Sequence, residues 1–178
     1  MQFESSTIPG CIVVAPNLLA DSRGVFAKTF HSTTFQHAGL ESVFKEQFIT
    51  ESAEGVLRGM HFQVPPHEHA KIVTCVSGEV LDVVVDLRRG SPMYRKHQAF
   101  SLVGTGKRSL YIPLGLAHGF LVLKGPAILT YSTTTEHEPS ADLGIHWDSF
   151  GFHWPIAAPV VSPRDTQLPP IAQFNSPF

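Results

Sequence analysis

Histidine is the side chain of this sequence that is best suited to proton transfer, because its ordinary pKa lies close to neutral pH. The chain contains ten histidines. His61 stands in the stretch Gly55-Val-Leu-Arg-Gly-Met-His-Phe-Gln63, and His118 stands in Tyr111-Ile-Pro-Leu-Gly-Leu-Ala-His-Gly-Phe120. A neutral imidazole is also a common metal ligand, so both kinds of chemistry have to be weighed for these two stretches.

Four further residues could take part in such chemistry: Arg58, Lys71, Tyr131 and Asp165. Taken singly, each has a plain structural interpretation. Arg58 would suit a surface ion pair, Lys71 a solvated position and Tyr131 the edge of a core. Asp165, which ends the stretch Ser162-Pro-Arg-Asp165, could simply shape a turn. Only their joint pattern can therefore indicate a function.

The composition is that of one globular domain. The chain has 178 residues, of which 43% are hydrophobic and 16% charged, and residues 1–178 suffice for one substantial core. The formal net charge of -2 makes nucleic acid an unlikely partner class. No apolar run or signal sequence is present, so we expect a soluble cytoplasmic protein without a membrane partner. Cys11 and Cys75 are too few for a disulfide framework.

Short strands dominate the expected secondary structure. Glycine and proline, 14 of each, cut the chain into short segments. In residues 79–87 the apolar side chains at every second position share one face, and Asp82 and Asp86 lie on the other. Further strands are expected at residues 11–15, 25–30, 47–50, 71–76, 97–102, 109–112, 118–123 and 127–134. This pattern predicts an all-β sandwich or barrel.

Few other elements are expected. Residues 33–39 favour a short helix, and Asp21-Ser-Arg-Gly24, Ser77-Gly78 and Arg89-Gly-Ser-Pro92 are typical turn sequences. The proline-rich tail from Pro155 onward is expected to cross the surface as extended chain. No linker or internal repeat divides the sequence.

Taken together, the motifs resemble the dTDP-4-dehydrorhamnose 3,5-epimerase family. The resemblance rests on Gly55–Gln63, Lys71, Gly78–Pro92, Ile112–Phe120, Tyr131, Gly144-Ile-x-Trp147 and Ser162-x-x-Asp165, in the order that the family shows. It extends from about Asp21 to Asp165. It implies an all-β jelly-roll (cupin) barrel, a homodimer and no metal or other cofactor. The reaction that it implies is epimerisation at C3 and C5 of a nucleotide-linked 4-keto-6-deoxyhexose, as in rhamnose, deoxysugar and polysaccharide biosynthesis.

The resemblance also implies roles for individual residues. His61 becomes the general base and Asp165 its carboxylate partner. Lys71 faces the developing enolate, and Tyr131 is the acid that returns a proton to the opposite face of the sugar.

Further residues are assigned to the binding of the substrate. Arg58 and His118 are expected to line the sugar and phosphate site. Arg23, Phe26 and Lys28 lie in a segment that the family associates with the nucleotide base. Phe26 and Phe30 share one strand face, and packing in a core or stacking on the base both remain open for them.

These residue types suit the reaction on chemical grounds. A base with a pKa near neutrality balances being unprotonated against being strong, which favours histidine. A carboxylate on the other ring nitrogen selects the tautomer and stabilises the imidazolium. Removal of the proton moves negative charge onto the C4 oxygen, where the cation of Lys71 lowers the barrier.

The sequence departs from the family pattern at several binding positions. The family usually carries a glutamate at the position of Lys28. It also tends to show Gln-x-Asn-x-Ser where this chain has Glu46, Phe48 and Thr50. Gln47, one place out of register, is our candidate substitute for the missing amide. The position of His69 is often a glutamine.

Lys28 suggests a hypothesis about the nucleotide. Thymine N3 carries a hydrogen that a carboxylate would accept, whereas a lysine can only donate. Cytosine N3 is an acceptor, so Lys28 would suit a CDP-sugar. The alternatives are that Lys28 points to solvent or to a phosphate and that a dTDP-sugar is bound.

A metal-dependent cupin oxygenase or isomerase is the main enzymatic alternative. His67 and His69 lie on alternate positions, and His118 follows a Pro-x-Gly spacing that is typical of metal cupins. The glutamate expected four or five residues after His69 is absent, and Lys71 would repel a metal ion.

Two narrower alternatives stay open. The chain could be an inactive sugar-binding cupin, although it retains all four residues with proposed catalytic roles. Alternatively, it could invert only C3 or only C5, or act as a 3,4-ketoisomerase, with a CDP- or GDP-sugar as substrate. The choice among these reactions depends on how the sugar ring sits relative to His61 and Tyr131.

Overall fold

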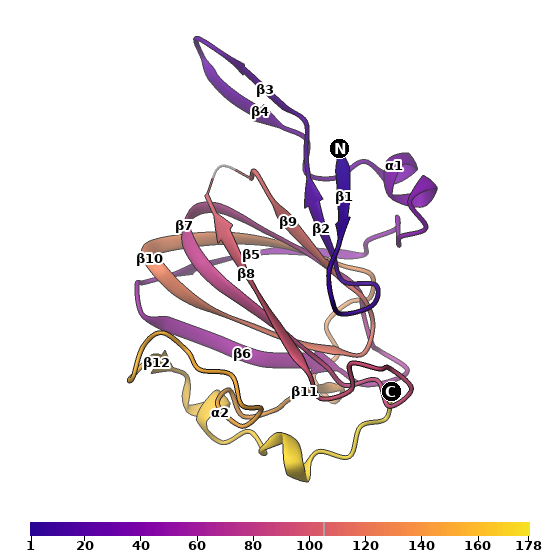
Figure 1. Ribbon diagram of the computed structural model, residues 1–178, viewed down its shortest axis with the longest axis vertical. Helices are drawn as coiled ribbons and strands as arrows, with labels where there is room; N and C mark the ends of the chain where they lie inside the picture. Colours follow the sequence, from indigo (N-terminus) through magenta and orange to yellow (C-terminus); the bar gives the residue numbers. More distant parts are fainter. Residues whose placement is uncertain (105) are drawn as a thin grey trace.

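Two long strands, β7 (Lys71–Asp86) and β10 (Leu116–Thr133), form the centre of the structure. Both are rich in valine, isoleucine, leucine and threonine, which suit a pleated and largely buried surface. They pair with each other in antiparallel register over nearly their whole length. The computed structural model describes residues 1–104 and 106–178 (Figure 1).

Shorter strands surround this pair. They are β1 (Gln2–Ser5), β2 (Ile12–Ala15), β3 (Leu18–Asp21), β4 (Gly24–Ala27), β5 (Glu46–Ser52), β6 (Val56–Gln63), β8 (His97–Val103), β9 (Ser109–Ile112), β11 (Asp142–Gly144) and β12 (Val160–Val161). The helices are α1 (Ser32–His37), α2 (Pro163–Thr166) and the 3-10 turn η1 (Ile171–Gln173). The all-β prediction is confirmed.

The central pair belongs to both walls of the barrel. The first half of β7 borders β9 and its second half borders β8. The first half of β10 borders β6 and its second half borders β5. One wall therefore contains β9, β7, β10 and β5, and the other contains β8, β7, β10 and β6. A cavity between the walls is lined by side chains from both halves of β10.

The prediction that turns interrupt these two strands was wrong. Gly78 has a φ of +79°, which a glycine adopts readily, so β7 bends there without ending. A Cβ atom at Gly78 would lie 2.6 Å from the carbonyl oxygen of Lys124. On β10, the register with β7 shifts between Val122 and Leu129. Each long strand is thus one bent strand, where the sequence suggested two separate ones.

Both faces of the barrel sheets are buried. The inner cluster includes Val73, Val84 and Leu129. A second cluster, on the outer face of β7 and β6, contains Val83 and is covered by aromatic residues of the C-terminal tail. A third lies under α1 and contains Phe35 at its centre. Because both faces are covered, the central strands have apolar residues on both faces, and their sequences form nearly continuous apolar runs.

Asp82 and Asp86 are two of the charged residues that are buried in this interior. The predicted alternation along residues 79–87 is present, but both aspartates are fully buried. Asp86 pairs with Arg88 at 2.7 Å and accepts a hydrogen bond from Ser91 at 2.6 Å. Asp82 has another partner, described below.

The helix and tail predictions are met in part. The expected helix at residues 33–39 is α1, Ser32–His37. The C-terminal tail was expected to be wholly extended, but it contains β12, α2 and η1 and runs along one side of the barrel (Figure 1). In the part of the chain that the structure describes, no helix has the length and apolar character needed to cross a membrane.

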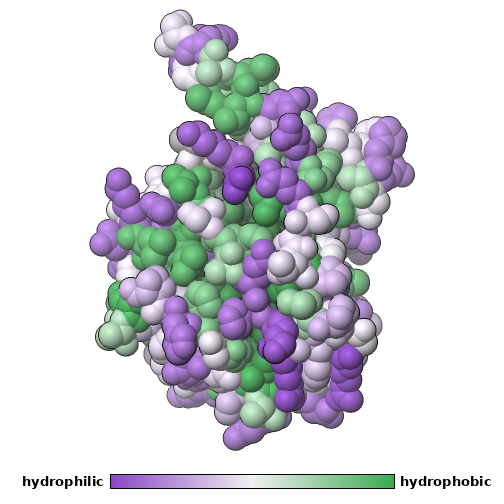
Figure 2. Space-filling model, viewed as in Figure 1, coloured by the Kyte–Doolittle hydropathy of each residue, from purple (hydrophilic) through white to green (hydrophobic). Residues whose placement is uncertain are grey.

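A β3–β4 hairpin projects from one end of the barrel (Figure 1). It turns at Asp21–Gly24, as the sequence predicted. Its apolar side chains are exposed, including Leu19 at 67% and Phe26 at 58% (Figure 2). Phe30, beyond the end of β4, packs against Phe35 at a ring distance of 4.9 Å. Phe30 therefore joins the cluster under α1, whereas Phe26 has no core to enter within its own chain.

Candidate active site

β6 carries His61 into the cavity between its two neighbours, β10 and β11. His61 lies directly opposite His118 across the β6–β10 pair. Two residues earlier, a Cβ atom at Gly59 would lie 2.5 Å from the Cα atom of Gly119. The absence of side chains at both positions lets the two strands approach closely just before His61.

His61 is paired with Asp165. Its Nε2 atom lies 2.7 Å from Asp165 Oδ1, and Asp165 Oδ2 accepts a hydrogen bond from the backbone N–H of Gly59 at 3.1 Å. Ser162 caps α2 by accepting a hydrogen bond from the Asp165 backbone N–H at 3.1 Å. The parallel pairing of β12 with β6 brings this short helix to His61. The predicted pair is thus formed across 104 residues of chain.

This contact defines the chemistry of His61. A carboxylate accepts hydrogen bonds, so Nε2 of His61 carries the hydrogen and Nδ1 is left with its lone pair. Asp165 is only 3% exposed. Burial alone would raise the pKa of Asp165, but the hydrogen bond and charge of His61 together with the Gly59 N–H bring that pKa below 3.8. Asp165 therefore stays ionised and would stabilise a protonated His61.

Lys71 begins β7 and lies inside the cavity wall. It is 8% exposed, and its Nζ donates a hydrogen bond to the carbonyl oxygen of His61 at 3.4 Å. Burial lowers the pKa of Lys71 to about 8 from the ordinary 10.5, against the opposing effect of the carboxylates of Asp142 and Asp82. Lys71 is still mostly a cation at neutral pH, but an inadequately solvated one. Such a cation would bind developing negative charge strongly.

Tyr131 lies on the second half of β10. Its ring stacks on Phe48 at 4.7 Å with 7° between the planes, and it meets the ring of His118 edge-on at 6.2 Å. Tyr131 is 5% exposed, and burial followed by the charge of Asp82 raises the pKa of its hydroxyl. The hydroxyl therefore keeps its proton and can act as an acid.

His118 forms a second histidine–aspartate pair, which the sequence interpretation missed. Its Nε2 atom lies 2.8 Å from Asp82 Oδ2, and both residues are buried. The signal was present in the sequence, because an aspartate within a valine-rich strand must have a partner if it is buried. The two residues are 36 positions apart in the sequence, so the partner can be identified only from the pairing of β7 with β10.

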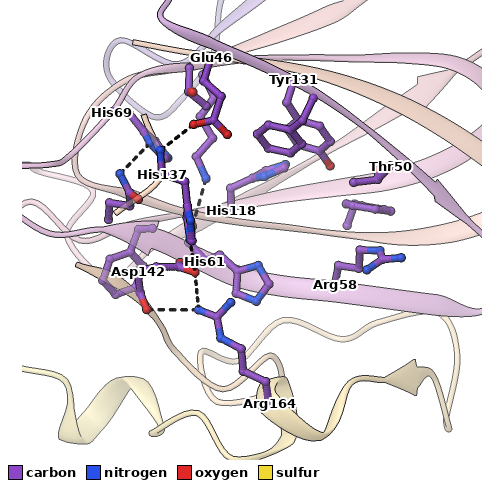
Figure 3. A pocket seen from close by; sticks show the side chains of 16 residues that line it. Glu46, Thr50, Arg58, His61, His69, His118, Tyr131, His137, Asp142 and Arg164 are labelled. Carbon is purple, nitrogen blue, oxygen red and sulfur yellow. Dashed lines mark hydrogen bonds and ion pairs between the residues drawn. The ribbon is translucent and has the colours of Figure 1, made fainter. Parts of the chain in front are cut away.

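A polar chain along one side of the cavity was also missed. Arg164 and His137 both contact Asp142 Oδ2, at 2.9 Å and 3.2 Å. The backbone N–H of His137 donates a hydrogen bond to Glu46 at 2.6 Å. Burial alone would raise the pKa of Asp142, but Arg164 and His137 bring it below its ordinary value. The four residues connect β5, β11 and α2 beside His61 (Figure 3).

Apart from Asp165 and Asp82, which lie behind His61 and His118, these side chains line one cavity of about 360 Å³, a size typical of small-molecule sites. Arg58 lies at its margin, where its guanidinium donates hydrogen bonds to Ser52 and to the carbonyl oxygen of Glu51. The cavity is lined by Glu46, Phe48, Thr50, Arg58, His61, Phe62, Gln63, His69, Lys71, His118, Phe120, Tyr131, Thr133, His137, Asp142 and Arg164. The structure thus brings together His61, Asp165, Lys71, Tyr131, Arg58 and His118, as predicted.

Gln47 is not among the lining residues. Its Nε2 atom donates a hydrogen bond to Ser132 at 3.3 Å, away from the cavity. Successive side chains of a strand point to opposite faces, so β5 directs Glu46, Phe48 and Thr50 inward and Gln47 outward. Within one chain, Gln47 therefore lies on the face of β5 opposite the position whose amide it was expected to replace, since a shift of one residue changes the face.

Arg23, Phe26 and Lys28 also lie outside this cavity. Arg23 and Phe26 belong to the projecting hairpin and Lys28 directly follows it. Arg23 pairs with Asp21 at 2.6 Å within the turn. A single chain therefore does not place these three residues at its own cavity.

No group of three or more histidine, cysteine, aspartate or glutamate residues is arranged to hold a metal ion within residues 1–104 and 106–178. Of the two histidines in the His-x-His stretch, His69 lines the cavity, and His67 does not. The chemistry that this arrangement offers directly is proton transfer by His61 and Tyr131, next to the cation of Lys71.

The family model of dTDP-4-dehydrorhamnose 3,5-epimerases matches residues 5–173. A dTDP-4-dehydrorhamnose 3,5-epimerase from Shigella flexneri is 37% identical over 168 residues, which cover 93% of each chain. A dTDP-4-dehydrorhamnose 3-epimerase from Streptomyces niveus is 36% identical over 168 residues, or 93% of this chain and 81% of the relative.

Solved structures match as well. A dTDP-6-deoxy-D-glucose-3,5-epimerase from Legionella pneumophila, in complex with dTDP-4-keto-L-rhamnose, has a TM-score of 0.92 to this chain at 31% identity. The match covers 98% of this chain and 94% of the other. It confirms the jelly-roll prediction.

The buried cation of Lys71 generates a prediction about stability. We expect Lys71→Met to increase the free energy of unfolding at pH 7 by about 1–3 kcal/mol, because a desolvated charge is replaced by an apolar side chain. The folded-state pKa of about 8 lies below the ordinary 10.5. The unfolded chain therefore binds more protons between these values, and wild-type stability rises with pH over that interval.

Urea unfolding of both proteins from pH 7 to 10.5 measures the gain in stability of Lys71→Met and the rise of wild-type stability with pH. Lys45→Met, at an exposed position, is the matched control and should change stability by less than about 0.5 kcal/mol. A Lys71→Met variant that is less stable than wild type at pH 7 would contradict the prediction.

Proposed function

Since the chain belongs to the dTDP-4-dehydrorhamnose 3,5-epimerase family, we propose that its His61–Asp165 pair starts the epimerisation of a dTDP-4-keto-6-deoxyhexose. The chain is an epimerase of that family, which acts at C3 and C5 of the sugar in dTDP-rhamnose biosynthesis. The single observation that carries the proposed role is the 2.7 Å contact between His61 Nε2 and Asp165 Oδ1 at the cavity wall.

In the first step, Nδ1 of His61 removes the proton from a carbon next to the ketone. The electron pair of the C–H bond forms a C=C bond to C4, and the π electrons of the ketone move onto its oxygen. Asp165 favours this transfer because its charge stabilises the imidazolium. The His61 side chain is 29% exposed, so it is open to the cavity, while that of Asp165 is 4% exposed.

Lys71 stabilises the enolate that results. Its ammonium is buried, and its pKa of about 8 shows that the cation is poorly compensated in the free site. A negative oxygen would supply the missing counter-charge, so Lys71 should bind the enolate more strongly than the neutral ketone. Stronger binding of the charged intermediate lowers the barrier without equally stabilising the substrate.

Tyr131 returns a proton to the other face of the same carbon. In Figure 3, Tyr131 and His61 extend into the cavity from different strands. The raised pKa of the Tyr131 hydroxyl keeps it protonated until it transfers the proton to the carbanion. The C4 carbonyl then re-forms with inverted configuration. No step of this mechanism uses a metal ion.

We further propose that the chain works as a homodimer in which the β3–β4 hairpin reaches the partner's cavity. The hairpin exposes Leu19, Val25 and Phe26 at 67%, 53% and 58%, which is costly for a segment that stays in water. β5 exposes Ile49 at 67% on its outer face, the face that also carries Gln47. Exchange of the hairpins would cover both surfaces.

The nucleotide is proposed to be dTDP. The relatives reported above carry dTDP-sugars in their names, and one is solved in complex with dTDP-4-keto-L-rhamnose. Lys28 is then explained by a contact with a phosphate or with solvent. This assignment takes the place of the cytosine hypothesis that Lys28 suggested.

The protein is also proposed to work in the cytoplasm. Cys11 and Cys75 are buried free thiols. Burial raises the pKa of Cys11 to about 12 and that of Cys75 to about 11, so both stay protonated and unreactive. Free, inert thiols are typical of proteins from a reducing compartment.

The role of His61 is tested by proton exchange. Wild-type protein incubated with dTDP-4-keto-6-deoxyglucose in deuterated water, in the presence of EDTA, should incorporate deuterium at C3 and C5. His61→Asn should reduce this exchange by roughly a hundredfold or more. His153→Asn, at an exposed position, should match wild type. Exchange in His61→Asn at the wild-type rate would refute the role of His61, and loss of wild-type exchange in EDTA that a divalent ion restores would favour the metal-dependent alternative.

The hairpin proposal is tested by complementation. Phe26→Ala and His61→Asn should each be weakly active alone. If the hairpin serves the partner's cavity, a mixed dimer contains one site in which both residues are wild type. Random pairing makes about half of the dimers mixed, so refolding the two variants together should restore roughly a quarter of wild-type activity. Absence of restoration, although light scattering shows dimers, would mean that the hairpin does not serve the partner's site.

The nucleotide is tested by calorimetry. We expect dTDP to bind at least tenfold more tightly than CDP, a difference of about 1.4 kcal/mol. Lys28→Glu, measured in parallel, shows whether that side chain contributes to the choice of base. Equal or tighter binding of CDP to the wild type would restore the cytosine hypothesis.

A further inference from the structure

His69 presents an unpaired N–H group at the cavity wall. It lies two residues before Lys71, in the segment between β6 and β7. The Nε2 atom of His69 is buried and has no hydrogen-bond partner among the residues that the structure describes. Buried polar groups are almost always paired, and an exception in a site of known chemistry requires an explanation.

The neighbouring Gln63 determines which nitrogen of His69 carries the hydrogen. Gln63 Oε1 accepts a hydrogen bond from the backbone N–H of Glu138 at 2.7 Å, and Gln63 Nε2 donates to the carbonyl oxygen of His67 at 2.7 Å. The orientation of the amide is thereby fixed. Its Nε2 atom also lies 3.2 Å from the carbonyl oxygen of Glu136 and 3.3 Å from Nδ1 of His69. An NH₂ group therefore faces Nδ1 of His69, which leaves no acceptor there for a hydrogen on that nitrogen. The hydrogen of His69 is therefore on Nε2.

His69 also remains neutral. Burial, and then the nearby ammonium of Lys71, lowers its pKa to about 3. His69 is therefore a hydrogen-bond donor without charge at any pH at which the protein works. A neutral donor suits a hydroxyl oxygen, whereas the charged Lys71 suits the oxygen that becomes an enolate.

We propose that His69 is a specificity-determining residue whose Nε2–H donates a hydrogen bond to the C3 oxygen of the keto sugar. This inference rests on the proposed function, in which Lys71 faces the C4 oxygen. Of the two carbons that flank the ketone, only C3 carries a hydroxyl, because C5 carries the methyl group and the ring oxygen. Loss of the C3 proton also brings the C3 and C4 oxygens into one plane, so neighbouring donors can hold both.

Two substitutions separate the N–H group from the rest of the side chain. In His69→Asn, the short amide can accept the hydrogen bond from Gln63 but places no donor at the position of Nε2. In His69→Gln, the longer amide places its NH₂ group near that position. His153→Asn repeats the first change at an exposed residue outside the cavity. Circular dichroism and thermal unfolding establish that each variant is folded.

Exchange at C5 is measured for each protein with dTDP-4-keto-6-deoxyglucose and with its 3-deoxy analogue. We expect His69→Asn to lower kcat/KM about 10- to 100-fold with the first substrate and less than about threefold with the analogue, which lacks the acceptor. His69→Gln should recover most of the loss, and His153→Asn should show none.

Three results would overturn the inference: an equal loss with both substrates, no loss with either, or no recovery in His69→Gln. Failure of the proposed function would be recognised separately, because wild-type protein would then exchange neither substrate.

Discussion

A buried carboxylate must be paired, and the pairing of Asp165 with His61 organises much of this protein. The contact joins the C-terminal tail to β6 and requires β12, the Ser162 cap and the N–H of Gly59 to lie in one place. The same contact selects the tautomer of His61 and leaves Nδ1 as the basic nitrogen. The docking of the tail is therefore a condition for chemistry, in addition to covering one face of the barrel.

The barrel interior holds several charged groups where an apolar core would be more stable. Asp82 is fully buried against His118, and Lys71 is buried with its pKa lowered to about 8. The desolvation of such groups opposes folding, so their presence here is better explained by a role in the site than by stability. The extensive apolar clusters on both faces of β7 stabilise the fold and offset the desolvation of these charged groups.

The surroundings of the proposed base, His61, differ from those of the proposed acid, Tyr131. His61 is open to the cavity and held by an ionised carboxylate, so it is suited to accept a proton. Tyr131 is enclosed between Phe48 and His118, so ionisation of its hydroxyl is disfavoured. A histidine that is open to the cavity and a tyrosine whose raised pKa keeps its hydroxyl protonated are thus suited to the two halves of the proposed inversion.

The sequence by itself determined the fold class and the candidate residues for proton transfer. Strand-forming segments between turns predicted a β barrel, and the motifs around His61, Lys71, Tyr131 and Asp165 predicted a proton-transfer site. These features are local in sequence or preserved as motifs. The tertiary structure decided which neighbours these residues have: Asp82 pairs with His118, Gln47 points outward, and the hairpin with Phe26 projects away from its own cavity. It also leaves Nε2 of His69 without a hydrogen-bond partner within residues 1–104 and 106–178. Each of these four outcomes depends on strand register and on contacts between distant segments. The residue types alone do not encode the register or the contacts, because the same residue one position along a strand faces the other way.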